Sequence, residues 1–248
     1  MSDKVSVIVP VYNASSVIAE TIASVTSQDH KDIELILVDD GSDDGSRDII
    51  GRYISSSVKL LCNTHEKGAA GARNTGIEAA EGRFIAFLDA DDLWKSDKLS
   101  RQIAFMKKWD AAFSFTGYEF ADEKGKGCGT IVRVPETITY SEALKNTTIF
   151  TSTVMFDMEK LEKADIMMPY VKSEDTATWW KVLKSGIRAY GLDESLTLYR
   201  RMGSTLSSNK IEAVRRIWNL YRKQEHLSFA VSVWCFCHWA VRAVARRV

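Results

Sequence analysis

Short apolar runs alternate with amphipathic stretches along roughly the first ninety residues. Four runs rich in β-branched and other apolar residues lie at residues 5–11, 33–38, 58–62 and 84–88. Such runs are typical of strands that are buried on both faces of a parallel sheet. The stretches between them have helical spacing, as at Val17, Ile18 and Ile22. We therefore predict an α/β fold with a doubly wound, mostly parallel sheet.

The alternation fades after residue 94, and the second half of the chain is predicted to be mixed. Residues 111–120 and 131–134 have strand patterns separated by a glycine- and lysine-rich turn at 122–129. We expect a main domain over residues 1–208, with halves at 1–95 and 96–208, and a helical tail over 209–248. Ser15 and Ser16 follow the first strand and could cap the first helix.

Three carboxylates directly follow the fourth apolar run. Asp89, Asp91 and Asp92 stand where a parallel strand would end, and such strand ends face the ligand crevice. Like charges this close repel unless a cation lies between them, and Mg²⁺ or Mn²⁺ prefers carboxylate and phosphate oxygens. One aspartate could instead cap the next helix, but three exceed that need. The cluster predicts a divalent metal site.

Polar and small residues also follow the first three strands. They are Tyr12, Asp39, Asp40 and the glycine-rich residues 67–76. A ring that stacks on a base, a carboxylate that accepts its hydrogen bonds and a metal that holds a diphosphate together predict a nucleotide diphosphate ligand. The glycine-rich segment matches neither GxGxxG nor GxxxxGKS, which argues against a dinucleotide dehydrogenase or a P-loop enzyme. Taken singly, Tyr12 is more typical of core packing and Asp40 of a turn.

Composition fits a globular protein, because 45% of the residues are hydrophobic and the formal net charge is zero. The charge is uneven, since residues 200–248 hold ten Lys and Arg against two Asp and Glu. A basic tail favours an anionic surface, and nucleic acid is the alternative. The four cysteines have neither disulfide-framework nor zinc-site spacing, so we expect them to be reduced.

Four separated motifs occur in the order VSVIVPVYN, LILVDDGSDDGS, GAAGARNTGI and FLDADD. In this order and spacing they resemble the family 2 glycosyltransferases of the GT-A fold, over about residues 4–205. The resemblance implies that Pro10 and Tyr12 flank the base, usually uracil, and that Asp40 bonds it with support from Asp39.

The resemblance also assigns roles around the aspartate cluster. It implies that Asp91 is the direct ligand of Mn²⁺ or Mg²⁺, and that Asp89 holds ribose or a metal-bound water. Ala90 belongs to the same nucleotide-sugar site. Arg73 would orient the nucleotide or the acidic cluster, and Lys67 is a weaker candidate for the site.

Glu174 and Asp175 precede an amphipathic stretch at residues 176–183. Acids at a helix start have an ordinary explanation, because they complement the helix dipole. The pair also resembles the Glu-Asp motif in which the family places its catalytic base, which implies Asp175 as the base and Glu174 as the reserve candidate. Such a carboxylate takes the proton of an acceptor hydroxyl as it attacks, and a single displacement inverts the anomeric configuration.

A late basic segment, RRMGSTLSSNK, resembles the family's loop that closes over the diphosphate. It implies that Arg200 or Arg201, with Ser204, contacts phosphate oxygens, because guanidinium groups match them bidentately. The alternative is that both arginines are solvated charges beside an edge strand.

The tail carries a second amphipathic helix pattern over residues 209–225 and then an aromatic run at 229–241. The thirteen residues of this run span about 20 Å as a helix, less than the roughly 30 Å of a bilayer core. With its basic flank, it favours an in-plane membrane anchor, and a helix packed on the body or on a second subunit is the alternative.

Together with these patterns, the resemblance implies a metal-dependent, inverting hexosyltransferase of cell-surface polysaccharide synthesis. It would use a nucleotide-sugar donor, usually UDP-linked in this family, and a glycan acceptor on undecaprenyl. The chain start lacks the features of a secretory signal, so we expect a cytoplasmic enzyme on the inner face of the cell membrane that binds no nucleic acid. Two alternatives stay open at this point: a sugar-nucleotide-forming nucleotidyltransferase, and a non-catalytic subunit that binds nucleotide or glycan.

Overall fold

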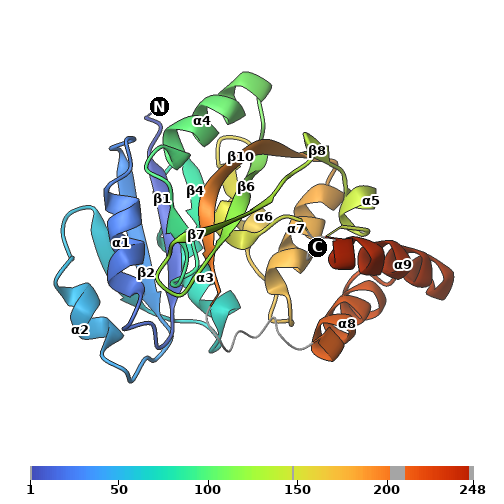
Figure 1. The fold of residues 1–248 in the computed structure, drawn as a ribbon, viewed down its shortest axis with the longest axis horizontal. Helices are drawn as coiled ribbons and strands as arrows, with labels where there is room; N and C mark the ends of the chain where they lie inside the picture. Colours follow the sequence, from blue (N-terminus) through green and yellow to red (C-terminus); the bar gives the residue numbers. More distant parts are fainter. Residues whose placement is uncertain (1, 147, 202–209, 246–248) are drawn as a thin grey trace.

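The computed structural model describes residues 2–146, 148–201 and 210–245. Within these ranges, one mixed sheet of ten strands has the order β3-β2-β1-β4-β9-β6-β10-β5, with β7 paired to β6 and β8 to β10 (Figure 1). The predicted α/β fold is therefore confirmed. Helices α1 and α2 lie at one end of the molecule, and α8 and α9 lie at the other.

The strands are β1 Val5–Val11, β2 Ile33–Asp39, β3 Val58–Cys62, β4 Phe84–Phe87, β5 Leu93–Trp94, β6 Phe113–Ala121, β7 Gly127–Val132, β8 Thr137–Ile138, β9 Met155–Asp157 and β10 Ala189–Arg200. The helices are α1 Ile18–Thr26, α2 Ser46–Gly51, α3 Ala69–Ala79, α4 Lys98–Trp109, α5 Tyr140–Ala143, α6 Lys163–Ile166, α7 Glu174–Lys184, α8 Lys210–Asn219 and α9 Phe229–Ala245. Two shorter turns are η1 Thr151–Thr153 and the π-helical η3 Leu220–Gln224.

The first four strands are parallel, and the strand order reverses between β1 and β4. Pairing of β1 with β4 ends at Ile8, so the two strands separate before Pro10. Proline has no N–H to donate, and at this position β4 requires none. Separation of neighbouring strands at a reversal of strand order opens a crevice at their carboxyl ends.

Both faces of the sheet are covered, which explains the continuous apolar runs. On one face the valines of β1 pack with Ile22 of α1 and Ile103 of α4. On the other face Ile8 packs in a cluster with Ile77 of α3 and Trp179 of α7. Alternate side chains of a strand point to opposite faces, so β1 contributes to both clusters.

The second half departs from the parallel pattern. β9 is antiparallel to both β4 and β6, whereas β10 runs parallel to β6. The predicted hairpin exists, but its turn is shorter than expected and β7 begins at Gly127. The reason is a tight turn in which Gly125, at φ +73°, donates to Asp122.

The predicted serine cap of α1 is wrong. The residue before the helix is Val17, and no side chain caps the first turn. The backbone N–H of Ser15 instead donates to Asp44, at 2.8 Å. The serines thus belong to a contact with the loop after β2, which the local sequence does not predict.

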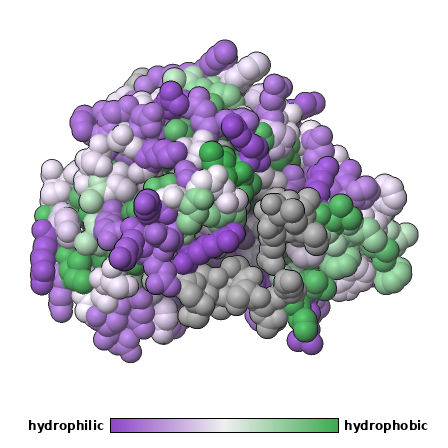
Figure 2. All heavy atoms as spheres, viewed as in Figure 1, coloured by the Kyte–Doolittle hydropathy of each residue, from purple (hydrophilic) through white to green (hydrophobic). Residues whose placement is uncertain are grey.

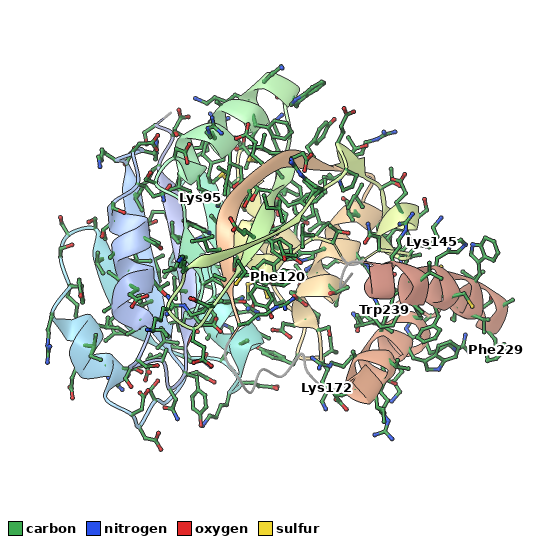
Figure 3. All side chains as sticks on the ribbon, in the orientation of Figure 1. Lys95, Phe120, Lys145, Lys172, Phe229 and Trp239 are labelled. Carbon is green, nitrogen blue, oxygen red and sulfur yellow. The ribbon has the colours of Figure 1, made fainter. Side chains whose placement is uncertain are left out.

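The tail packs on the body, so the alternative interpretation of it is confirmed in part. The ring of Tyr221 stacks on Trp180 of α7 with centroids 5.4 Å apart, and its hydroxyl donates to the Leu144 carbonyl. Ser232 and Cys235 of α9 are buried against the body. Trp239 lies between α9 and α8 (Figure 3).

The opposite side of α9 is uncovered. Trp234 and Val241 are 62% and 70% exposed, and Val231 and Val233 are exposed beside them. Green hydrophobic residues gather at this end of the molecule in Figure 2. Among the described helices, none has the length and apolar character needed to cross a bilayer. We call the exposed residues Val231, Trp234 and Val241 the outer face of α9.

A pair of glycine substitutions tests the packing at the start of α3. A Cβ at Gly71 would lie 1.9 Å from the Glu66 carbonyl oxygen, whereas a Cβ at Gly51 would meet nothing within 4 Å. We expect Gly71→Ala to lower the free energy of unfolding by about 1–3 kcal/mol, because the backbone must shift. Gly51→Ala should raise it by about 0.4–1 kcal/mol. Urea denaturation measures both, and effects of the same sign would contradict the packing described.

Candidate active site

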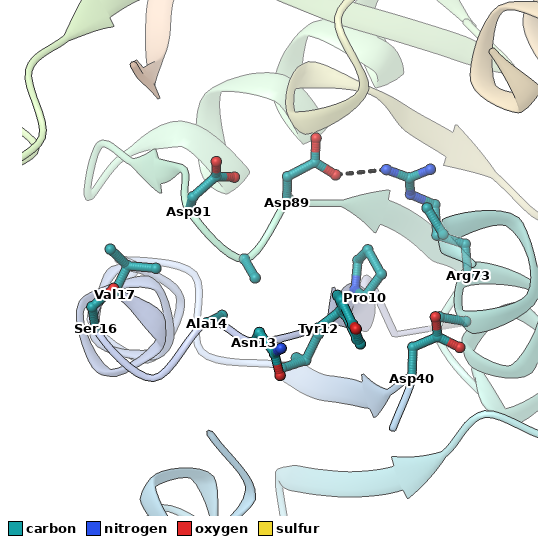
Figure 4. A pocket seen from close by; sticks show the side chains of 14 residues that line it. Pro10, Tyr12, Asn13, Ala14, Ser16, Val17, Asp40, Arg73, Asp89 and Asp91 are labelled. Carbon is teal, nitrogen blue, oxygen red and sulfur yellow. Dashed lines mark hydrogen bonds and ion pairs between the residues drawn. The ribbon is translucent and has the colours of Figure 1, made fainter. Parts of the chain in front are cut away.

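A crevice of about 400 Å³ opens where β1 and β4 separate. Its walls come from the segment after β1, the first turns of α3 and the segment after β4 (Figure 4). Of the predicted site residues, those that line it are Pro10, Tyr12, Asp40, Arg73, Asp89, Ala90 and Asp91. The strand ends therefore come together as the sequence predicts.

Tyr12 provides an exposed ring at the mouth of the crevice. Its side chain is 55% exposed, so it is not the core residue that its type alone would suggest. The Lys67 ammonium lies over this ring, 4.9 Å from its centroid. Lys67 is thus placed against Tyr12 and is not part of the crevice wall.

The two aspartates after β2 have different surroundings. Asp39 is buried and accepts the backbone N–H groups of Gly41 and Ser42, at 3.3 and 3.2 Å, so it shapes the turn. Asp40 reaches the crevice and accepts from the Asn63 side chain at 2.6 Å and from the Gly68 N–H at 2.8 Å. These bonds fix the Asp40 carboxylate, which is consistent with its predicted role as a hydrogen-bond acceptor for the nucleotide base.

Arg73 connects the crevice with the start of α7. Its guanidinium donates to Asp89 at 2.7 Å and to Glu174 at 2.8 Å, and only 5% of the residue is exposed. Burial disfavours its charge, but Asp89 and Glu174 more than compensate and raise the pKa of Arg73 above its ordinary value. Arg73 therefore stays positively charged between the acid after β4 and the acid at the start of α7.

The other two acids after β4, Asp91 and Asp92, have raised pKa values. Burial, followed by repulsion from Asp89, raises the pKa of Asp91 to about 6. Asp92 is fully buried, and burial with the charges of Asp89 and Asp91 raises its pKa well above its usual range. No salt bridge joins Asp91 to a cation within the described part of the chain.

The turn η1 connects the aspartate cluster with α7. The Ser152 hydroxyl accepts the Asp89 N–H at 3.0 Å and donates to Asp92 at 2.5 Å. The hydroxyl of the preceding residue, Thr151, donates to Asp175 at 2.9 Å. Two consecutive side chains therefore fix the acids of the crevice relative to the acid at the start of α7.

The environments of Glu174 and Asp175 separate the two base candidates. Glu174 is committed to Arg73, and burial raises its pKa against the lowering effect of that arginine. Asp175 accepts from the Thr151 hydroxyl and from the N–H of Thr176, at 2.6 Å, and forms no salt bridge with any residue that the structure describes. A carboxylate without a cationic partner is the better proton acceptor, so this geometry favours Asp175.

The two late arginines have different surroundings. Arg200 is 1% exposed and donates to Glu20 at 2.7 Å, so it is not a solvated charge. It lies outside the crevice wall, yet it is close enough to Asp91 to lower the pKa of that acid. Arg201 lies over the Phe120 ring, 3.7 Å from its centroid. Ser204 lies outside the described residues.

Four aromatic rings form a cluster beside η1. Phe150 precedes Thr151 and packs against Tyr118 and Tyr199, with centroids 5.0 and 4.7 Å away. Phe120 packs against Tyr199 at 5.5 Å and carries Arg201 on its face. We call these four residues the aromatic cluster. Its members come from β6, β10 and a loop that are far apart in the sequence, so no local pattern predicts the cluster.

The side chains of the crevice supply only part of the coordination shell that a metal ion needs. No group of three or more His, Cys, Asp and Glu side chains is arranged to hold a metal ion in the described ranges. Asp91 nevertheless faces the crevice with a raised pKa, which is the condition that a bound cation would relieve. A Mg²⁺ or Mn²⁺ ion here would complete its shell with phosphate oxygens of a ligand.

Two bacterial glycosyltransferases are similar to this chain over most of its length. The chain is 44% identical over 247 residues to a Bacillus subtilis glycosyltransferase, TuaG, assigned to teichuronic acid biosynthesis, which covers 98% of this chain and 97% of that protein. It is 40% identical over 217 residues to the Escherichia coli UDP-Glc:alpha-D-GlcNAc-diphosphoundecaprenol beta-1,3-glucosyltransferase WfgD, covering 87% of this chain and 84% of WfgD.

Solved structures share the fold. S. aureus TarS 1–349 in complex with UDP-GlcNAc matches with a TM-score of 0.71 at 24% identity, over 96% of this chain and 71% of that one. The mannosyltransferase PcManGT from Pyrobaculum calidifontis, in complex with GDP-Man and Mn²⁺, matches with a TM-score of 0.71 at 21% identity, over 98% and 74%. The family model for glycosyl transferase family 2 matches residues 6–164. With its strand-end acids and these relatives, the chain belongs to glycosyltransferase family 2.

Proposed function

We propose that the protein transfers a hexose from a UDP-sugar to a sugar carried on undecaprenyl diphosphate, during synthesis of a cell-surface polysaccharide. The names of the relatives support this substrate pair, since WfgD uses UDP-Glc and an undecaprenyl-linked acceptor. Family membership leaves no place for the nucleotidyltransferase alternative.

The observation that carries the proposal is the link between the crevice and Asp175. Arg73 joins Asp89 to the residue next to Asp175, and η1 joins the same two regions through hydroxyl groups. A donor in the crevice and an acceptor at Asp175 would thus meet in a fixed orientation. Holding two reactants in this way removes much of the entropic part of the barrier.

The donor would lie with its base between Tyr12 and Asp40. The ring offers a stacking surface, and the fixed carboxylate accepts a base N–H. The diphosphate would then point toward Asp91 and the first turn of α3, whose free N–H groups favour an anion. A bound Mn²⁺ or Mg²⁺ would supply Lewis-acid stabilisation of the leaving diphosphate.

The acceptor hydroxyl would lose its proton to Asp175 as it attacks the anomeric carbon. Thr151 and the Thr176 N–H hold the carboxylate in place for this transfer. A displacement on the face opposite the leaving diphosphate inverts the configuration, so an α-linked donor would give a β-glycoside. The neighbouring aromatic cluster offers ring faces for the acceptor sugar.

The outer face of α9 would bring the enzyme to the membrane that holds its acceptor. An exposed tryptophan flanked by valines matches the interfacial region of a bilayer, and exposed arginines such as Arg215 and Arg242 favour anionic headgroups. The inner face of α9 covers the core, so the helix would lie on the surface as part of the body.

Replacement of the proposed base tests the chemistry. Asp175→Asn keeps the shape of the side chain but removes its basicity, so kcat should fall by about 10²–10⁴-fold. The thermal shift produced by UDP-sugar and Mn²⁺ should stay unchanged. Transfer from UDP-glucose to an α-GlcNAc-diphospholipid measures the rate. A near-normal rate would exclude Asp175 as the base, and a wild-type protein that binds the donor but transfers nothing would favour a non-catalytic role.

Replacement of Asp91 tests the metal. Asp91→Asn should abolish the Mn²⁺-dependent part of the thermal shift with UDP-glucose, whereas exposed Asp32→Asn should leave it intact. Because the pKa of Asp91 is about 6, protons compete with the metal at low pH. The shift of the wild type should therefore be full above pH 7 and weaken as pH falls through 6. A shift independent of both Mn²⁺ and Asp91 would exclude this metal site.

Two matched tryptophans test the membrane contact. Trp234 on α9 is 62% exposed and Trp109 at the end of α4 is 51% exposed. We expect Trp234→Ser to weaken sedimentation with phosphatidylglycerol vesicles about tenfold or more, and Trp109→Ser to have no effect. Point substitutions are preferable to deletion of α9, because its inner face covers Tyr221. Equal effects of the two substitutions would refute a specific contact through α9.

A further inference from the structure

A second cavity, of about 360 Å³, lies between the segment that joins β7 to β8, helix α5 and the last turns of α9. Arg133 and Arg242, which are far apart in sequence, both line it. Thr148 and Asn146 form another part of the wall. Neither arginine belongs to the crevice described above. The cavity therefore needs an explanation of its own.

The charge around this cavity favours an anion. Arg133 pairs with Asp193 at 3.3 Å, but both side chains are largely exposed, so the pair is weak and can exchange for a stronger partner. Glu142 also lines the cavity, and its carboxylate is already used by the N–H and hydroxyl of Thr139. Guanidinium groups bind phosphate oxygens bidentately, so two arginines match a diphosphate.

Further cations lie close to the cavity. Lys145 directly precedes Asn146. Its charge helps to lower the pKa of Glu142 and opposes the rise that burial causes in the pKa of Cys235 of α9, so it lies near both side chains. Figure 3 places Lys145 beside α9. Arg188 likewise lowers the pKa of Glu142. Lys145 and Arg188 thus add two cations to the two arginines of the wall, beside the acids Glu142 and Asp193.

The cavity is close to the proposed base. Thr148 lines it, and Thr151, three residues later, holds Asp175. Three residues of chain span at most about 11 Å. One sugar residue with its phosphate linkage can bridge a gap of this order. A sugar whose hydroxyl reaches Asp175 could therefore place its own diphosphate among the arginines.

The cavity also adjoins the outer face of α9. Val241 of that face is 70% exposed and directly precedes Arg242. A ligand that consists of a sugar, a diphosphate and a hydrocarbon chain would meet three surfaces in the matching order: Asp175, the arginines and the apolar side of α9. We propose that Arg133 and Arg242 bind the diphosphate of the lipid-linked acceptor, an inference that rests on the proposed function.

Calorimetric titration with farnesyl diphosphate tests the site directly. UDP and Mn²⁺ are added first, so that the donor crevice is filled. We expect Arg133→Gln/Arg242→Gln to weaken binding at least about tenfold, since hydrogen bonds to charged groups are lost. The matched control, Arg52→Gln/Arg101→Gln, removes the same charge from exposed positions at the end of α2 and on α4 and should have little effect. Unchanged binding in the first variant, or equal loss in both, would overturn the proposal.

Two further ligands identify the source of the phosphate. Farnesol lacks the diphosphate and should bind with no dependence on the arginines. Inorganic pyrophosphate lacks the chain and should bind more weakly than farnesyl diphosphate. Equal affinity for both diphosphates would overturn a lipid-linked ligand in favour of free phosphate.

Transfer assays separate this inference from the proposed function. With an α-GlcNAc-diphospholipid acceptor, the double arginine variant should show a raised acceptor KM and an unchanged donor KM. Transfer with an unchanged acceptor KM would refute the arginine site and leave the function standing. Arginine-dependent binding of farnesyl diphosphate without any transfer would support the site and refute the function.

Discussion

The site is organised by mutual repulsion of carboxylates around the buried cation of Arg73. Five acids gather at the ends of β4 and the start of α7, namely Asp89, Asp91, Asp92, Glu174 and Asp175. Arg73 neutralises two of them directly and Arg200 acts on Asp91 from behind the crevice wall. Of the remaining acids, Asp91 lines the crevice, where a cation-bearing ligand would lower its energy. The repulsion between these carboxylates therefore lowers the stability of the free protein and raises its affinity for a metal-bound nucleotide.

The donor side of this arrangement could be predicted from the sequence, because it depends on local rules. Each apolar run is long enough for one buried strand, and the residues that follow must lie at one edge of a parallel sheet. Tyr12, Asp40 and Asp91 are therefore placed by position in the chain alone. The reversal of strand order between β1 and β4 then determines where the crevice opens.

Other parts depend on contacts between distant segments and could not be predicted. Nothing local marks Thr151 and Ser152 as partners of acids 24 and 60 residues away. Arginine is usually a surface residue, yet Arg200 is buried, and its ion-pair partner Glu20 comes from the distant helix α1. Helix α9 was expected either to bind the membrane or to pack on the body. In the structure one of its sides is buried against the body and the opposite side is exposed. The pattern of one helix does not say which side a neighbour will cover.

The turn η1 has a consequence for how such enzymes diversify. Because adjacent residues hold the acids after β4 and Asp175, one peptide unit sets the spacing between the crevice acids and the proposed base. The rings of Tyr118, Phe120 and Tyr199, which we propose to face the acceptor sugar, lie on β6 and β10 and can change without altering this spacing. Substrate choice and catalytic alignment are thus separable in evolution, and new specificities can arise on an unchanged chemical core.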